Sequence, residues 1–256
     1  MIKIENTEVM GWEAAIRGMR NPMNSWEKSD SGWFSSEDDM GVNYVQYNSH
    51  SDPSELYFIG SNDLNLMKRL AKAGTDHRKF MRMITVYMDI TAPLYWWKEF
   101  DTYKVGTVAN SCSTMHKITE KEFEMSDFSC EHMKPTSIKI MHDVIDILNK
   151  YRADYNNPEA EKLGVKKDYW WQMIQILPSS YNQRRTVMLN YEVLANIYKS
   201  RKDHKLDEWR VHETPEEHKF RNKDFSSGMW GFCDWIESLP YSELITKKGE
   251  NNNEHD

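Results

Sequence analysis

The stretch from Ala92 to Lys117, APLYWWKEFDTYKVGTVANSCSTMHK, strongly constrains how this chain can fold. The aromatic run Tyr95-Trp96-Trp97 precedes a segment rich in small hydroxyl and amide side chains, among them Thr107, Asn110 and Ser113. A solvated loop does not need two adjacent tryptophans, and a plain core strand does not carry so many polar side chains. We therefore expect this stretch to form the wall of a polar ligand site.

The segments around this stretch predict a mixture of strands and helices. Residues 83–91 (MITVYMDIT) alternate between apolar and polar side chains, which is typical of a half-buried strand. Capping residues and apolar spacing predict the remaining elements. In chain order these are a strand over residues 2–10 and helices over residues 12–19, 61–73, 136–152, 169–176 and 179–201.

Domain organisation follows from the same pattern. Residues 20–40 are predicted to form a long structured loop, either a lid or a surface insertion pinned by its aromatic side chains. Residues 229–245 are aromatic-rich and are expected to pack back on the body. Because no internal repeat or low-complexity linker is present, we expect one domain over residues 1–246 and a disordered polar tail over residues 247–256.

Composition and charge exclude several classes of protein. The formal net charge of -7 argues against a general nucleic-acid-binding protein, which needs a basic face to neutralise phosphates. The three cysteines lack CxxC spacing, so neither a disulfide framework nor a zinc site is expected, and a reducing cytoplasm is the natural setting. We expect no signal peptide and no transmembrane helix, because no apolar run approaches about 18 residues.

A second group of polar residues lies in the predicted helix that follows Leu177 and Pro178. Asn190 and Arg201 are separated by about three helical turns, so they would project from one face roughly 16 Å apart. An amide and a guanidinium at this spacing could hold a long anionic ligand at two points. Alternatively, Arg201 lies at the surface and interacts with the dipole at the helix C-terminus.

Other reactive residues carry weaker signals. The basic residues of 76–82 either bind phosphate or form a solvated charged surface. Cys112 lies between two serines, and because no activating base is apparent, we favour a small buried residue over a nucleophile. Neither GxGxxG nor GxxxxGK[ST] occurs, which weakens any Rossmann or P-loop hypothesis.

The order of these parts resembles the flavin-dependent thymidylate synthases over roughly residues 60–210. In that family a strand ends in Ala-Pro, as at Ala92-Pro93, and an aromatic segment precedes an Arg-His-Arg signature with spaced Ser, Asn and Ser. Without gaps, Thr102-Tyr103-Lys104 falls on the triplet and Thr107 on the first Ser, and one inserted residue brings Asn110 and Ser113 into register. From Leu177-Pro178, residues Asn190, Leu194, Asn196 and Arg201 fall in family register with no gap.

The resemblance implies an α/β (α+β) fold with a mixed, largely antiparallel sheet packed with long helices. It implies FAD as cofactor, NADPH and methylenetetrahydrofolate as co-substrates, and methylation of a dUMP-like pyrimidine nucleotide to a dTMP-like product by a homotetramer. By position, Ser113 and Arg201 would be catalytic. The positions matching flavin contacts are Lys104, Thr107, Asn110, Asn190 and Asn196.

The chain also departs from the family pattern. Arginines expected by the resemblance are replaced by Thr102, Met115, Ile174 and Glu192, and only Lys104 keeps a cation in the triplet. Each lost arginine removes a charge-assisted hydrogen bond to flavin or phosphate. The alternative is therefore a catalytically degenerate nucleotide-binding, flavin-binding or scaffold protein. An unrelated interaction protein would require both matches to arise by chance.

Overall fold

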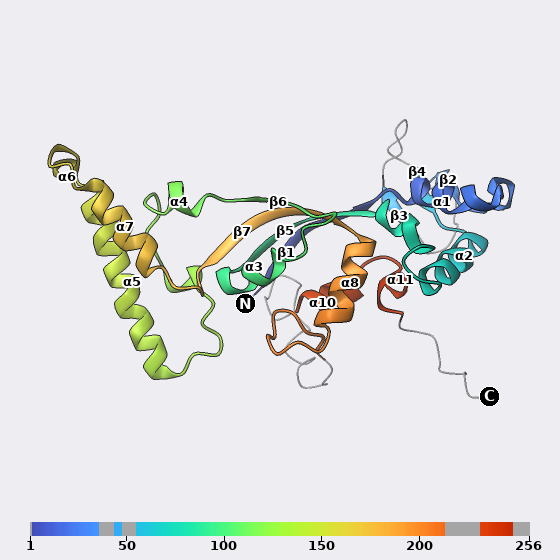
Figure 1. Ribbon diagram of the computed structural model, residues 1–256. Coiled ribbons are helices and arrows are strands. Elements are labelled where there is room, and N and C mark those ends of the chain that lie inside the picture. Colours follow the sequence, from blue (N-terminus) through green and yellow to red (C-terminus); the bar gives the residue numbers. More distant parts are fainter. Residues whose placement is uncertain (1, 36–43, 48–54, 213–230, 248–256) are drawn as a thin grey trace.

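A four-stranded sheet runs through the centre of the molecule in the computed structural model, which describes residues 2–35, 44–47, 55–212 and 231–247. Its strand order is β1-β5-β7-β6, and every neighbouring pair is antiparallel (Figure 1). The strands are β1 (Lys3–Met10), β5 (Thr85–Pro93), β6 (Val108–Ser111) and β7 (Asn182–Asn190). The strands predicted over residues 2–10 and 83–91 are confirmed, as is the mixed and largely antiparallel fold class.

The two faces of this sheet differ in what covers them. On β5, the alternating side chains Ile84, Val86, Met88 and Ile90 are buried, as their spacing predicts. Figure 1 shows helices on this side of the sheet, among them α3 (Leu94–Phe100), α8 (Tyr191–Arg201), α10 (Phe232–Glu237) and α11 (Glu243–Thr246). The opposite face is open among the described residues and carries exposed Tyr87 together with polar side chains.

The core under the sheet is built largely from aromatic rings. Trp96 stacks on Trp209, with ring centroids 4.4 Å apart, and on Phe100, with centroids 5.1 Å apart. Trp97 is equally buried and donates its indole N–H to the carbonyl of Gln183 at 2.9 Å. The expectation that residues 92–117 form a ligand wall is therefore wrong for the aromatic half of the stretch. These rings hold α3 against the body because burying each one removes a large apolar area from water.

The predicted helix over residues 179–201 is also wrong in its first half. Residues 182–190 form β7, a central strand that pairs with both β5 and β6, and the helix begins only at Tyr191. Val187 and Leu189 are buried while Arg184 and Thr186 are exposed, so the alternation of a strand is present. Glutamine, arginine, methionine and leucine favour helices, but pairing on both sides overrides that local preference.

A helical arm extends from one end of the sheet and has its own apolar cluster (Figure 1). It consists of α5 (Pro135–Asn156), α6 (Pro158–Lys162) and α7 (Lys166–Ile176), so the helices predicted over residues 136–152 and 169–176 are confirmed. Met141, Ile145 and Leu148 recur on one face of α5 and pack with Met173 of α7. The short α4 (Thr114–Lys117) lies between β6 and this arm.

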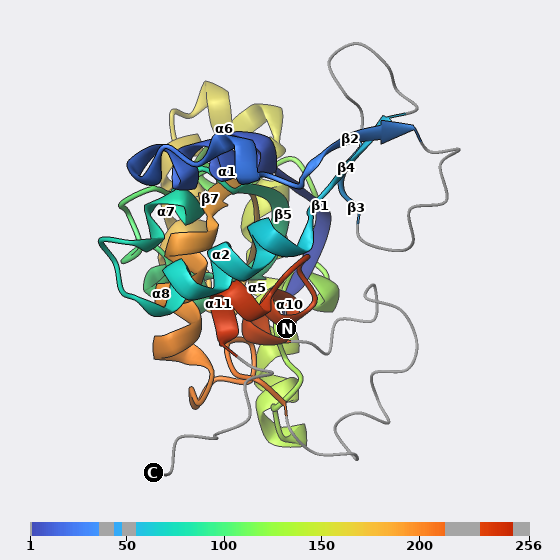
Figure 2. The same cartoon turned by 90° about the vertical axis from the view of Figure 1, so that its right-hand side faces the viewer.

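The N-terminal residues form a further layer at the other end of the sheet. Helices α1 (Trp12–Arg20) and α2 (Ser61–Lys72) confirm two predicted helices, and α2 contacts α11, which in turn contacts α8 (Figure 2). A small sheet beside them has the order β2-β4-β3, with β2 (Gly32–Ser35), β3 (Tyr44–Tyr47) and β4 (Glu55–Phe58).

The predicted loop over residues 20–40 is only partly within the described residues. Its described part contains two short 3-10 helices, η1 (Asn21–Met23) and η2 (Trp26–Lys28), followed by β2. A third 3-10 helix, η3 (Arg78–Arg82), precedes β5. The segment expected to pack back on the body does so as α10 and α11, whereas the predicted tail lies outside the described residues beyond Lys247. None of the described helices is long and apolar enough to cross a membrane.

Candidate functional site

The turn from Asp101 to Thr107 lies along helix α8. It is the part of the stretch 92–117 that contacts the helix carrying Arg201, close to Asn190 at the helix start. At one end of α8, the hydroxyl of Tyr103 accepts a hydrogen bond from Arg201 Nε at 2.9 Å. At the other end, Gly106 lies against Asn190 and Val193. The turn therefore spans the eleven residues of α8, a length of about 16 Å.

Gly106 allows this close approach. Its φ of 75° lies in the left-handed region, and a Cβ atom there would be 3.1 Å from Asn190 Nδ2 and 3.2 Å from Val193 Cγ2. Any other residue would meet both backbone strain and crowding against α8. The glycine thus fixes the turn, with Lys104 and Thr107 in it, next to the start of the helix.

Arg201 ends α8 in a half-buried polar cluster rather than free at the surface. Its Nη1 lies 2.5 Å from Glu99 Oε2, and its guanidinium carbon lies 5.1 Å from the ring centroid of Trp209. The ion pair, the Tyr103 hydroxyl and the aromatic ring together orient the planar guanidinium. A ligand anion that binds Arg201 must therefore replace or join the carboxylate of Glu99.

His204 completes this cluster. Its Nδ1 accepts a hydrogen bond from the backbone N–H of Leu206 at 3.2 Å, and its Nε2 lies 2.8 Å from Arg201 Nη1. Nε2 lies 3.4 Å from Glu99 Oε2. Glu99 consequently faces both Arg201 and His204, and it is the one anion that the described contacts give to this pair.

Two side chains of the turn retain unused polar capacity. Lys104 is exposed, and Thr107 is half-buried. The Oγ1 atom of Thr107 is shielded from solvent, yet it has no hydrogen-bond partner within the described chain. A buried hydroxyl without a partner is costly, so this atom is suited to a ligand group that supplies the missing hydrogen bond.

The two predicted asparagines have different local roles. Asn190 caps α8, because its Oδ1 accepts the backbone N–H of Val193 at 3.1 Å. Asn196 lies on another face of the helix, where its Oδ1 accepts a hydrogen bond from Arg78 Nη2 at 3.2 Å. The structure therefore places Asn190, and not Asn196, next to the turn that carries Lys104 and Thr107.

Arg78 also pairs with Glu192, which stands where the resemblance leads us to expect an arginine. Arg78 Nε lies 2.8 Å from Glu192 Oε2, and both side chains are largely buried. Within the basic cluster at residues 76–82, Arg78 is therefore neither free to bind phosphate nor exposed to solvent, because it is largely buried and paired with Glu192. The positive charge expected from an arginine on α8 is supplied here by Arg78 of η3.

Asn110 lies in β6 and Ser113 follows that strand, so neither is part of the turn along α8. Ser113 caps α4, where its Oγ accepts the backbone N–H of His116 at 3.2 Å. Ser111 pairs with Arg185, which is five residues along β7 from Asn190, a separation of about 17 Å. Asn110 is therefore opposite Thr186 in the middle of β7, and Ser113 lies further towards the Asn182 end, whereas Gly106 in the turn lies beside Asn190.

The open face of the sheet carries a polar cluster that the sequence analysis missed. Asp89 accepts hydrogen bonds from Thr186 at 2.6 Å, Arg184 at 2.8 Å and Asn6 at 2.8 Å. These bonds, that of Thr186 first, lower the pKa of Asp89 to about 2. The alternation of Arg184 and Thr186 with buried Val187 was the available signal, and it was obscured by the helix assigned to these residues.

The three cysteines lie in different surroundings. Cys112 is exposed, so the expectation of a small buried residue there is wrong. Cys233 is buried beneath the sheet, and burial raises the pKa of its thiol well above the ordinary value. Within the residues that the structure describes, no group of histidine, cysteine and carboxylate side chains has the arrangement of a metal site.

The fold of this chain matches solved structures, although its sequence matches no family model. No protein-family model and no curated protein matches the sequence. A solved structure of thymidylate synthase X (ThyX) from Helicobacter pylori with FAD and dUMP matches with a TM-score of 0.55 and 14% identity, covering 97% of this chain and 98% of that chain. The chain has the fold of the flavin-dependent thymidylate synthases.

Two further solved structures match the chain. Another Helicobacter pylori flavin-dependent ThyX structure, complexed with FAD and dUMP, gives a TM-score of 0.51 at 15% identity and covers 79% of this chain and 86% of that chain. The UMP/dUMP methylase PolB from Streptomyces cacaoi, bound with 5-Br dUMP, gives 0.49 at 12% identity and covers 96% and 94%. At 12–15% identity these likenesses concern the fold, and the site residues are judged from this chain alone.

Proposed function

We propose that this protein binds FAD and a pyrimidine nucleotide similar to dUMP, and that it methylates the nucleotide reductively to a dTMP-like product. The observation that carries the proposal is the turn from Asp101 to Thr107 lying along α8 in a thymidylate synthase fold. This arrangement joins a half-buried arginine to a partnerless buried hydroxyl and an exposed lysine. Such groups are suited to phosphate and carbonyl oxygens.

The residues near α8 fit a flavin in their chemistry. Lys104, Thr107 and Asn190 would hold FAD, with Asn110 and Asn196 as further contacts, and Arg201 would hold the nucleotide. Bound FAD would supply hydride transfer, while methylenetetrahydrofolate would supply the carbon and NADPH the reducing equivalents. The chain itself would bind and orient these molecules, since cofactor chemistry of this kind needs no cysteine nucleophile.

Assembly into a homotetramer is part of the proposal. Ser113 caps α4, whereas Arg201 ends α8 beside Glu99, and no described contact joins the two, so copies of the chain would combine to bring the two groups together. Exposed apolar side chains on the helical arm are available for such contacts: Ile140, Ile147, Leu163 and Trp171. Light scattering at micromolar concentration tests this, and a strict monomer would contradict a site shared between subunits.

The cofactor is tested by visible absorbance of the purified protein and by titration with FAD. We expect a yellow protein or saturable FAD uptake, and Thr107→Val should weaken it because the variant keeps the shape but removes the hydroxyl. Ser200→Ala, at an exposed hydroxyl on α8, is the matched control. A colourless protein that takes up no FAD would overturn the proposed enzyme function.

The nucleotide is tested by calorimetric titration with dUMP. Arg201→Ala should weaken dUMP binding at least about tenfold, because one charge-assisted hydrogen bond to phosphate is worth about 1.5–3 kcal/mol. Lys199→Ala is the control, since Lys199 is an exposed cation on the same helix. Equal dUMP affinity in the Arg201→Ala variant and the wild type would refute the role given to Arg201.

A catalytically degenerate binding or scaffold protein is the second candidate, and one observation favours it. Arg201 already has a carboxylate partner in Glu99, so the free energy of nucleotide binding would be reduced by the need to displace it. A single-turnover assay with FAD, NADPH and methylenetetrahydrofolate separates the two candidates. Saturable dUMP binding without formation of dTMP would support the degenerate protein.

A further inference from the structure

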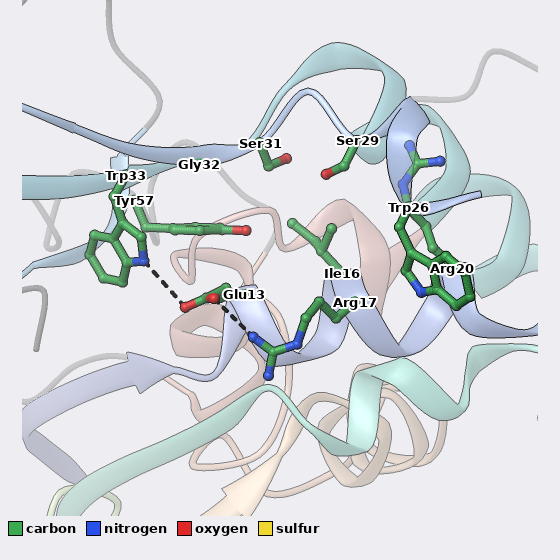
Figure 3. A pocket seen from close by; sticks show the side chains of 10 residues that line it. All are labelled: Glu13, Ile16, Arg17, Arg20, Trp26, Ser29, Ser31, Gly32, Trp33 and Tyr57. Carbon is green, nitrogen blue, oxygen red and sulfur yellow. Dashed lines mark hydrogen bonds and ion pairs between the residues drawn. The ribbon is translucent and has the colours of Figure 1, made fainter. Parts of the chain in front are cut away.

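A cavity of about 190 Å³ lies in the N-terminal layer, between α1, the segment from Trp26 to Trp33, and β4 (Figure 3). Trp26 and Trp33 lie on opposite sides of it, and Ile16 and Tyr57 supply further apolar surface. None of the residues that line it belongs to the site proposed for FAD and nucleotide. The cavity therefore requires an explanation of its own.

The walls of the cavity are held by a buried network that leaves little freedom to collapse. Arg20 Nε lies 2.6 Å from Asp63 Oδ1, and both side chains are almost fully buried. Asp63 Oδ2 accepts hydrogen bonds from the hydroxyls of Ser29 and Ser31 at 2.7 Å each. In return, Asp30 accepts the backbone N–H groups of Asn62 and Asp63 at 2.8 and 3.0 Å. The segment is thereby fastened to the start of α2.

The hydrogen bonds of this network leave few polar atoms in the cavity free to bind a ligand. The hydroxyls of Ser29 and Ser31 point along the upper wall but are already committed to Asp63. Tyr57 is 3% exposed, and its hydroxyl points into the cavity, where no described residue forms a hydrogen bond with it. Burial, followed by the charge of Glu13, raises the pKa of Tyr57 well above the ordinary value, so this hydroxyl stays neutral.

The charges around the cavity are compensated. Glu13 lies 2.9 Å from Arg17 and accepts the indole N–H of Trp33 at 3.2 Å (Figure 3). Neither an anion nor a cation would therefore find an unpaired opposite charge there. The remaining recognition elements are the aromatic surfaces, which favour a flat ring, and the single hydroxyl of Tyr57.

We propose that this cavity binds a neutral, flat, single-ring molecule carrying one hydrogen-bonding group that pairs with the hydroxyl of Tyr57. Its size is suitable, because an apolar cavity of about 150 Å³ in another protein binds benzene. Trp33 supports the Tyr57 ring at 5.1 Å in an edge-to-face contact and thereby fixes the direction of the hydroxyl.

The test uses phenol as the probe and the indole N–H signals of the full-length protein in NMR spectra. We expect phenol to shift the Trp33 signal, which Trp33→Phe identifies by its disappearance. Tyr57→Phe should weaken phenol binding about tenfold while leaving toluene binding unchanged, because only phenol can use the hydroxyl. Tyr87→Phe, at an exposed tyrosine on the open sheet face, is the matched control.

Further measurements separate loss of folding from loss of binding in the cavity. Unchanged positions of the remaining indole signals in Tyr57→Phe show that the variant is folded. Absence of any Trp33 shift up to about 10 mM phenol would overturn the proposal, as would equal phenol affinity in Tyr57→Phe and wild type. Cyclohexanol binding as tightly as phenol would refute the preference for a flat ring. Loss of FAD or dUMP binding alone leaves the cavity proposal standing, since the two sites share no residue.

Discussion

Two arginine–carboxylate pairs in this protein differ in how firmly they are held. In the Arg20–Asp63 pair the side chains are 5% and 0% exposed, whereas in the Arg201–Glu99 pair they are 18% and 33% exposed. Asp63 receives four further hydrogen bonds, from Ser29, from the backbone of Asp30 and from the backbone and hydroxyl of Ser31. Glu99 has solvent on one side. The first pair is therefore part of the framework, and the second can exchange its partner for a ligand.

Removal of Asp63 should give the largest effect and is the strongest test of this contrast. Asp63→Ala leaves Arg20 charged and buried, and it also leaves the 29–31 segment without its acceptor. Breaking a buried pair costs about 3–5 kcal/mol, and we expect a loss of that size in the free energy of unfolding measured with urea. Glu159→Ala, which breaks an exposed pair with Lys162, is the control and should change it by less than about 0.5 kcal/mol.

The same pair predicts a dependence on pH. Burial alone would raise the pKa of Asp63, but the hydrogen bonds from Ser31 and Ser29 and the charge of Arg20 outweigh it and lower the pKa. A lowered pKa in the folded state adds stability above the unfolded value of about 4, and this stability is lost as the pH falls below it. A loss of stability in Asp63→Ala that stayed constant down to pH 2 would contradict the assignment.

Some elements of the fold follow directly from the pattern of apolar residues in the sequence. Strand β5 was predictable because Val86, Met88 and Ile90 alternate with polar residues, and α5 because Met141, Ile145 and Leu148 repeat at helical spacing. Strand β7 was missed, because the helix preference of its residues outweighed the alternation of buried Val187 and Leu189 with exposed Arg184 and Thr186. Local sequence carries no information about its pairing with β5 and β6.

For the candidate site, the sequence proposed Asn190 and Arg201 as site residues but gave no information about their surroundings. The partner of Arg201, Glu99, lies 102 residues away in the chain, and the partner of Glu192, Arg78, lies on a different element. Contacts of this kind depend on how α3, α8 and η3 pack, so spacing in the sequence cannot give them. The cavity beside Tyr57 was missed for the same reason, because α1, η2 and β4 meet only in the folded chain.

Glu99→Gln tests whether the more exposed pair is exchangeable. The variant keeps the shape of the side chain but removes the charge that competes for Arg201, so dUMP affinity should rise by up to about tenfold. In the Arg201→Ala background the same change should have no effect on dUMP affinity. A fall in dUMP affinity in Glu99→Gln would show that Glu99 orients Arg201 for binding instead of competing with the nucleotide.

Asp89→Asn tests a third carboxylate, on the open face of the sheet. The Asp89 side chain is 16% exposed, which is between Asp63 and Glu99. It should lower the free energy of unfolding by about 1 kcal/mol at pH 7, because charge-assisted bonds from Thr186 and Arg184 are weakened at a partly solvated site. The pKa of Asp89 is about 2 in the folded protein, so its contribution is complete above about pH 4 and disappears as the pH falls to 2. Urea unfolding of both proteins across this range measures the difference, and Asp146→Asn, at an exposed position on α5, is the control.

Tyr57→Phe should have the smallest effect on stability, with a sign opposite to that of Asp63→Ala. Both residues border the same buried network, but the Asp63 carboxylate is fully hydrogen-bonded whereas the Tyr57 hydroxyl has no described partner. Removing a buried polar group that lacks a partner relieves its desolvation cost, so the free energy of unfolding should rise by a few tenths to about 1 kcal/mol. A loss of more than about 1 kcal/mol would show that the hydroxyl is already bonded in the free protein. A gain in stability combined with weaker phenol binding is the result expected of a residue that serves a ligand and not the fold.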